Sequence, residues 1–270
     1  MKQKKNCNRH HYQQKRRKLL GKTATLFKLG CVLIIESACS TLPSTAATPT
    51  STSTKPTPAP KSTVTGKNIT EEDIVKAIVQ HMNLDQKLGQ MTIVEFQGST
   101  FNANLQQMVL KNYIGGVLIE NKNSNVQTRT QLVALDHAMQ AGAHIPLFIT
   151  TDYEGGLVNE LRLITGERAS EAAIGATGNP QVAYDAGHSA AADLKALGLN
   201  VNFMPIVDVL TNPSNPGLPA RTFGSNATLV TDMGRAYLKG LSAGDVVGCL
   251  KHVPGLGSAN LDPHLSLPTM

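Results

Sequence analysis

Residues 146–156 read Pro-Leu-Phe-Ile-Thr-Thr-Asp-Tyr-Glu-Gly-Gly, an apolar run that ends in acidic residues and a glycine pair. A stretch of helical composition follows at Pro180–Leu197, and Val201–Val209 is a second apolar run. This order predicts two parallel strands joined by a crossover helix. It decides the fold class, because parallel strands with helical crossovers build α/β sheets.

The same alternation extends along most of the chain. Five apolar runs predict strands: Met91–Phe96, Gly116–Ile119, Pro146–Thr150, Val201–Val209 and Val246–Leu250. Three intervening stretches predict helices: Val126–Ala141, Pro180–Leu197 and Leu229–Ala243. An earlier helix is predicted to begin after Thr70, which precedes three acidic residues. The strands are continuously apolar, as is typical of strands buried on both faces. Both a (β/α)8 barrel and a doubly wound open sheet fit this pattern.

Polar residues follow the predicted strands at their carboxyl ends. Asp152 follows the third strand, Asp208 ends the fourth, and Lys251 with His252 follows the fifth. Both candidate folds bind ligands at this edge of the sheet, so we expect the site there.

The first 67 residues differ from the rest in charge and composition. They hold 13 Lys and Arg and one acidic residue, whereas residues 68–270 hold 12 Lys and Arg and 18 acidic residues. The folded part is therefore acidic, which argues against nucleic acid as a partner. Residues 1–39 have the order of an export signal: basic, then apolar, then the small residues before Cys39. This end resembles a bacterial lipoprotein signal.

We expect three parts: residues 1–39 as export signal or lipoprotein-like anchor, 40–67 as a Ser/Thr/Pro-rich disordered linker, and 68–270 as the folded domain. The protein is then exported, with membrane or cell-wall attachment through its N-terminus. Cys249, the one cysteine of the domain, lies in an apolar run and is expected to be a buried small hydrophobe.

Asp262-Pro263-His264 places a carboxylate two residues from an imidazole. A carboxylate that bonds one ring nitrogen makes the other a usable acid or base near neutral pH. Lys251 and His252 are donors suited to hydroxyl groups. The alternatives are a simple Asp-Pro turn and a strand-capping histidine. A metal site from the two histidines and Asp262 has no distinctive spacing, and we expect none.

Several segments together resemble the N-terminal catalytic barrel of glycoside hydrolase family 3. They occur in the family's order and cover nearly all of residues 70–270. The segments are Leu84–Met91, Ile149–Gly156, Asn202–Asp208, Asn212–Pro216, Arg221–Gly224 and Lys251–Pro268. The resemblance implies a (β/α)8 barrel, here incomplete, with about five βα units.

The Asp-x-His continuation resembles the β-N-acetylhexosaminidase branch of that family. The resemblance implies retaining hydrolysis of N-acetylglucosamine-containing wall or chitin-type saccharides, with His264 as acid/base and Asp262 as its partner. It also implies that Asp152, Arg221, Lys251 and His252 bind the sugar, and that no cofactor is needed. The expected partner is an oligosaccharide or muropeptide.

Three residues depart from the family's pattern: Leu256 for a histidine, Leu157 for an arginine and Pro263 for a serine. The family's nucleophile is an aspartate on a later strand, so we expect it to be absent from this chain. Two alternatives stay open: a β-glucosidase of the same family and a non-catalytic sugar-binding fragment.

Overall fold

The computed structural model describes residues 69–268, all within one of the chain's two units. The expected export signal and linker, residues 1–39 and 40–67, lie outside the described residues. Within residues 69–268, every helix is too short or too polar to span a membrane.

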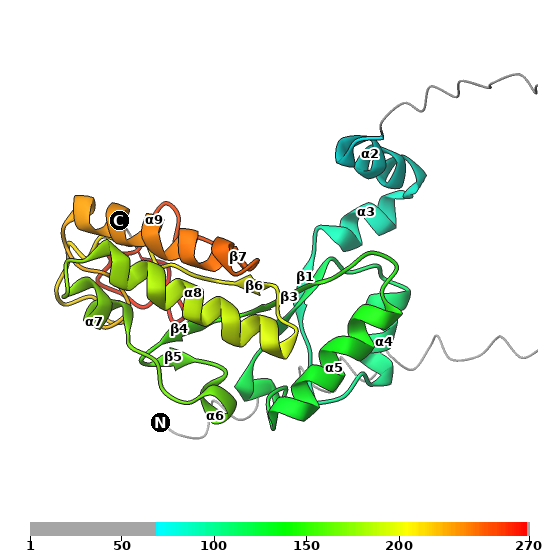
Figure 1. Ribbon diagram of the computed structural model, residues 1–270, viewed down its shortest axis with the longest axis horizontal. Coiled ribbons are helices and arrows are strands. Elements are labelled where there is room, and N and C mark those ends of the chain that lie inside the picture. Colours follow the sequence, from blue (N-terminus) through cyan, green and yellow to red (C-terminus); the bar gives the residue numbers. More distant parts are fainter. Residues whose placement is uncertain (1–68, 269–270) are drawn as a thin grey trace, which may run out of the picture. The chain divides into compact units, whose positions relative to one another are not determined.

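A five-stranded parallel sheet forms the centre of this unit (Figure 1). Its strands, in chain order, are β1 (Ile93–Glu95), β2 (Gly116–Ile119), β3 (Phe148–Thr151), β6 (Val201–Asn202) and β7 (Val247–Gly248). Their order across the sheet, β1-β2-β3-β6-β7, is the same as their order along the chain. A doubly wound sheet reverses direction at a switch point, whereas a barrel adds each strand on the same side. The strand order therefore selects the barrel type, here as an incomplete α/β fold.

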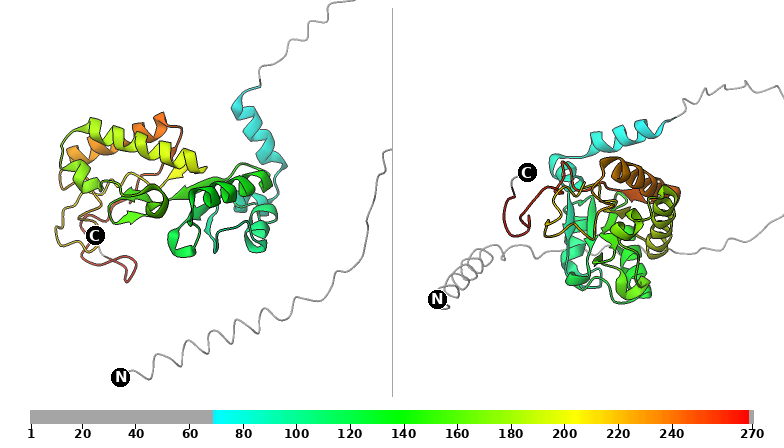
Figure 2. Two further views of the ribbon diagram at one scale, coloured as in Figure 1. Left: turned by 60° about the horizontal axis from the view of Figure 1, so that its bottom comes forward. Right: turned by 90° about the vertical axis from the view of Figure 1, so that its left-hand side faces the viewer.

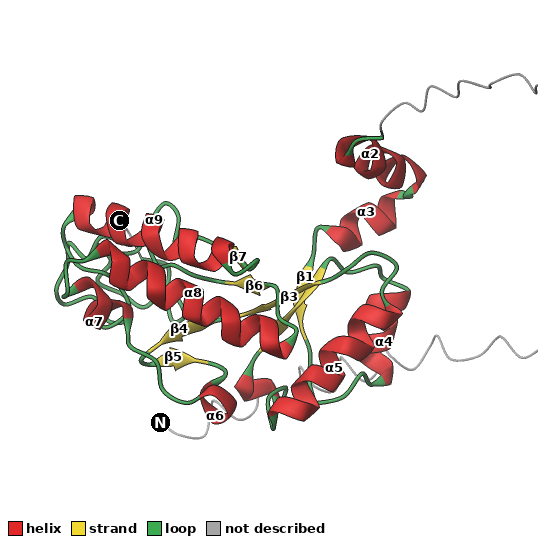
Figure 3. Cartoon of the chain, in the orientation of Figure 1, coloured by secondary structure: helices red, strands yellow, loops and turns green. Residues whose placement is uncertain are grey.

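Helices cover one face of the sheet (Figure 3). These helices are α4 (Ala103–Leu110), α5 (Arg129–Gly142), α8 (Pro180–Leu197) and α9 (Ala227–Ala243). Val117, Ile119 and Ile149 are fully buried on this side. On the opposite face, Ile93 and Phe148 flank Gly116 in the parallel register and are 42% and 51% exposed.

Seven further elements complete the described part of the chain. They are α2 (Glu71–His81), α3 (Leu84–Gln90), the 3-10 helix η1 (Asn121–Asn123), the hairpin strands β4 (Tyr153–Gly155) and β5 (Val158–Asn159), α6 (Arg162–Thr165) and α7 (Glu171–Gly175). Helix α2 begins with the predicted cap: the Thr70 hydroxyl accepts from the Asp73 amide, and Asp73 accepts from the Thr70 amide. This reciprocal pair satisfies two amides that the first helical turn leaves free.

Two predictions need correction. The expected strand Val201–Val209 is reduced to β6 and one isolated bridge at Ile206, because Pro205 has no amide hydrogen to donate to a ladder. The expectation of a buried Cys249 is wrong, since its side chain is exposed beside β7, the last strand at one edge of the sheet. An edge strand lacks a neighbour on one side, and this leaves the residues after it open to solvent.

Candidate active site

A cluster of charged side chains lies at the carboxyl ends of β3 and β7. The Lys251 ammonium contacts Asp152 and lies 2.6 Å from Glu154 Oε1. Arg221 donates to both oxygens of the Glu154 carboxylate, each at 2.8 Å. This two-pronged contact is the strong form of an arginine–carboxylate pair. The result is a chain of alternating charges in which Glu154 is shared by both cations.

Glu154 is 3% exposed, so its charge requires compensation. Burial pushes the pKa of Glu154 upward, but the Arg221 hydrogen bonds and the charges of Lys251 and Arg221 outweigh it and hold the pKa below its usual value. The same hydrogen bonds raise the pKa of Arg221. Both groups are therefore charged at neutral pH, and each depends on the other.

A second pair joins Asp208 to His252. The Asp208 carboxylate lies 2.7 Å from His252 Nδ1, accepts from the His252 amide at 3.1 Å, and also accepts from the Leu256 amide. Burial raises the pKa of Asp208, but these three hydrogen bonds prevail and lower it. An ionised Asp208 fixes the proton on His252 Nδ1 and leaves Nε2 for another partner.

Asp262 and His264 form the third pair, on the loop after Gly257. Asp262 Oδ1 lies 2.7 Å from His264 Nδ1 and accepts from the His264 amide at 2.9 Å. These bonds lower the pKa of Asp262, the backbone bond most strongly. The His264 side chain is 83% exposed, so the dyad stands at the mouth of the site.

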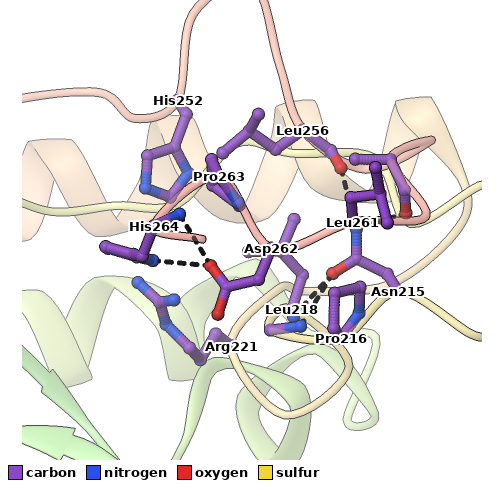
Figure 4. Close-up of a pocket in the computed structure, with 12 residues that line it drawn as sticks. Asn215, Pro216, Leu218, Arg221, His252, Leu256, Leu261, Asp262, Pro263 and His264 are labelled. Atoms are coloured by element: carbon purple, nitrogen blue, oxygen red, sulfur yellow. Dashed lines mark hydrogen bonds and ion pairs between the residues drawn. The ribbon is translucent and has the colours of Figure 1, made fainter. Parts of the chain in front are cut away.

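His252 of the second pair and both residues of the third pair line a pocket of about 380 Å³. Figure 4 shows His252, Arg221, Asp262 and His264 around it, with apolar side chains on the other side. The apolar part of the lining comes from Pro216, Leu218, Leu256, Ala259, Leu261 and Pro263. A pocket with a few convergent polar groups in an apolar wall is typical of small-molecule sites.

Asn215 holds the walls of this pocket together. Its side-chain oxygen accepts from the Gly217 and Leu218 amides at 3.0 and 2.9 Å. Its amide group donates to the Leu256 and Ala259 carbonyls at 2.8 and 3.1 Å. The C-terminal loop, red in Figure 2, is thereby fastened to the segment that follows β6.

Gly257 permits this close packing. A Cβ atom at Gly257 would lie 1.9 Å from the Val209 carbonyl oxygen, a distance that no side chain tolerates. Gly257 is therefore needed for this packing whether or not a ligand binds.

The six site residues predicted from the sequence fall into one region, but in two groups. Arg221, His252, Asp262 and His264 line the pocket, whereas Asp152 and Lys251 do not. Arg221 connects the groups, because it lines the pocket and also binds Glu154. The roles of these residues stay predictions.

No role was predicted from the sequence for Glu154 or Asp208, the carboxylates that orient Arg221, Lys251 and His252. One signal was available for both: Glu154 lies four positions after a predicted buried strand, and Asp208 lies at the end of another.

The strand order and a polar site at the carboxyl ends of parallel strands define a barrel-type α/β enzyme scaffold. The profile of the Glycosyl hydrolase family 3 N terminal domain matches residues 83–270. The chain therefore belongs to glycoside hydrolase family 3, as its motifs predicted.

The names of several relatives agree with membership of this family. The chain is 38% identical over 182 residues to Beta-hexosaminidase A of Pseudoalteromonas piscicida, covering 63% of this chain and 30% of that protein. It is 36% identical over 183 residues to an uncharacterized secreted glycosyl hydrolase of Arthroderma benhamiae, covering 66% of this chain and 51% of that protein. A family 3 β-N-acetylglucosaminidase structure from Paenibacillus superimposes with a TM-score of 0.68 at 32% identity, covering 70% of this chain and 36% of that chain. The chain thus spans a third to a half of the length of these proteins.

Proposed function

We propose that residues 69–268 bind N-acetylglucosamine-containing saccharides and supply the acid/base of a retaining β-N-acetylhexosaminidase. The observation that carries the proposal is the Asp262–His264 hydrogen bond beside a pocket that also holds Arg221 and His252. The names of the relatives support the substrate class. The cell-wall or chitin-type origin of the saccharide belongs to the same proposal, as does export, for which a secreted relative is the support.

In this proposal His264 transfers a proton and Asp262 orients it. Ionised Asp262 accepts a hydrogen bond from His264 Nδ1–H; the proton on Nε2 passes to the glycosidic oxygen as the glycosidic bond breaks, and Nε2 later takes a proton from water. The exposure of His264 suits this role, because the leaving group departs toward solvent.

The remaining polar residues bind the sugar. Asp152 accepts hydrogen bonds from hydroxyl groups, while Lys251 and His252 Nε2 serve as polar partners for ring substituents. Arg221 fixes Glu154, and Glu154 in turn fixes Lys251. Each of these groups is already held by a partner, so little side-chain entropy is lost when a sugar binds.

The retaining mechanism also requires a nucleophile about 5 Å from the acid/base. The proposal assigns this role to no residue in the range 69–268. We therefore expect the purified 270-residue chain to bind the sugar without turning over a glycoside.

A binding and turnover experiment on the purified chain tests these points. N-acetylglucosamine and glucose are titrated by NMR, and chromogenic aryl N-acetyl-β-glucosaminide and aryl β-glucoside serve as substrates. We expect N-acetylglucosamine to bind more tightly than glucose. Asp152→Ala should weaken binding, whereas Asp185→Ala, which alters an exposed acid on α8, should not.

The other outcomes decide between the alternatives. A preference for glucose would favour the β-glucosidase alternative. Turnover well above the blank would place a nucleophile within the chain. Absence of binding to either sugar by a cooperatively folded chain would refute the proposal.

A further inference from the structure

Glu171, the first residue of α7, is a buried acid that the roles above do not use. It is 1% exposed. Its Oε1 atom accepts from the Ile206 amide at 3.0 Å, and its Oε2 atom is buried with no hydrogen-bond partner among the described residues. A half-satisfied buried carboxyl group is costly, so its presence calls for an explanation.

On one side, Glu171 follows a segment that packs against residues 152–156, which carry Asp152 and Glu154 and include strand β4. The Gly156 amide donates to the Arg168 carbonyl at 3.0 Å. A Cβ atom at Gly155 would lie 2.3 Å from the Ala169 carbonyl oxygen. The residues just before Glu171 are therefore in direct backbone contact with residues 152–156.

On its other side, Glu171 fixes the segment that pairs with Lys251. The Val207 amide donates to the Lys251 carbonyl at 2.7 Å, and the Lys251 amide donates to the Pro205 carbonyl at 3.1 Å. In an extended chain successive amides point to opposite sides, so the Ile206 amide between them points away from Lys251. On that side, the Glu171 carboxyl group accepts the hydrogen bond that a neighbouring strand would otherwise accept.

The charges nearby require Glu171 to be neutral. Asp152 and Glu154 balance Lys251 and Arg221, and a further carboxylate would leave a net negative charge in a buried cluster. We propose that Glu171, as an uncharged carboxylic acid, is a positioning residue that sets Lys251 for sugar binding by holding Ile206. The inference rests on the proposed function and names a further residue of that site.

The surrounding charges agree with a neutral acid. Burial raises the pKa of Glu171 well above its usual range; Glu154 adds to this rise, while the Ile206 amide, Lys251 and Arg221 oppose it. Tyr237 of α9 is the other titratable group influenced by Glu171. Burial first, and then Glu171, raises the pKa of Tyr237, so it too is neutral.

Two substitutions separate the positioning role from mere filling of space. Glu171→Gln keeps an acceptor for the Ile206 amide and removes the ionisation, whereas Glu171→Leu fills similar space without an acceptor. The backbone amide resonances of Ile206 and Lys251 report position, N-acetylglucosamine titration reports binding, and thermal melting reports folding.

We expect Glu171→Gln to bind within about twofold of the wild type and Glu171→Leu to bind roughly tenfold more weakly, the size expected from the loss of one hydrogen bond. Both amide resonances should move in Glu171→Leu and stay in Glu171→Gln. In the wild type, affinity for N-acetylglucosamine should fall as the pH rises through the ionisation of Glu171. The side-chain carboxyl carbon resonance of Glu171 monitors that ionisation. Glu171→Gln should show no such fall.

Unmoved resonances and unchanged binding in Glu171→Leu would overturn the inference. If Glu171→Leu does not melt cooperatively, the pH dependence of sugar affinity tests the inference instead. An equal loss of affinity at alkaline pH in Glu171→Gln and in the wild type would overturn the inference. If the wild type binds no sugar, the proposed function fails, yet the amide resonances still test the positioning role.

Discussion

Replacement of Asp136 by asparagine should stabilise the protein at neutral pH. Asp136 lies in α5, is 2% exposed, and neither carboxyl oxygen has a hydrogen-bond partner among the described residues. The side chain faces Gly198, where α8 ends: a Cβ atom there would lie 3.1 Å from Asp136 Oδ2. The end of a helix carries partial negative charge, which disfavours a second negative group.

The magnitude follows from the shifted ionisation. Burial raises the pKa of Asp136 from 3.8 to about 8. Between these values the folded state binds the proton and the unfolded state releases it, so stability falls as pH rises through that window. At pH 7 the cost of keeping this proton is about 4 kcal/mol, an upper bound because a buried site relaxes. Asparagine does not ionise, so Asp136→Asn removes this cost.

Urea unfolding followed by circular dichroism, at intervals from pH 5 to pH 8, measures the effect. The free energy of unfolding of the wild type should decline across this range relative to Asp136→Asn, and the two curves should diverge as pH rises. Asp185→Asn, at an exposed site on α8, is the matched control and should parallel the wild type. Parallel curves for Asp136→Asn and the wild type would refute the reasoning, because they would mean that Asp136 ionises normally in the fold.

Three further substitutions test the site. Arg221→Ala should lower the free energy of unfolding by about 3 kcal/mol, because it leaves Glu154 buried with one cation fewer; a loss below about 0.5 kcal/mol in urea unfolding would contradict the pairing. Asn215→Ala should accelerate hydrogen exchange at least about tenfold at the Gly217 and Leu218 amides, which donate to the Asn215 side-chain oxygen. Unchanged protection of both amides would exclude the bracing role of Asn215. Gly257→Ala should destabilise by about 1–3 kcal/mol through overpacking, whereas Gly217→Ala, which has open space, should be near neutral in the same thermal melts.

Local signals explain which helices the sequence predicted well. Helix α8 spans Pro180–Leu197, as expected, because Asn179 caps its first turn, Pro180 fits the first helical position, and Gly198 adopts the left-handed conformation that ends it. Strand β2 also has the predicted bounds, Gly116–Ile119, since the short apolar run begins at a glycine pair and ends before the acidic Glu120.

Long-range contacts explain what the sequence could not predict. Strands β4 and β5 lie within and shortly after residues 152–156, where no alternating apolar pattern marks a hairpin. Glu154 is separated from Arg221 by 67 positions, and Glu171 from Ile206 by 35. Composition and spacing identify such acids as polar residues near strand ends, but only the folded chain shows which amide or cation each one meets.

The strand order gives these distant contacts a common cause. Because the strands are added in chain order and run parallel, their carboxyl ends meet at one edge and bring acids and bases from separate segments together. Burying those charges is tolerable only when each has a partner, and Glu154 is shared by Lys251 and Arg221. The side chains expected to contact sugar are therefore those whose positions are fixed by other charges. It follows that Glu154→Ala and Glu171→Leu, at residues that do not line the pocket, should weaken sugar binding as strongly as a substitution in the pocket wall.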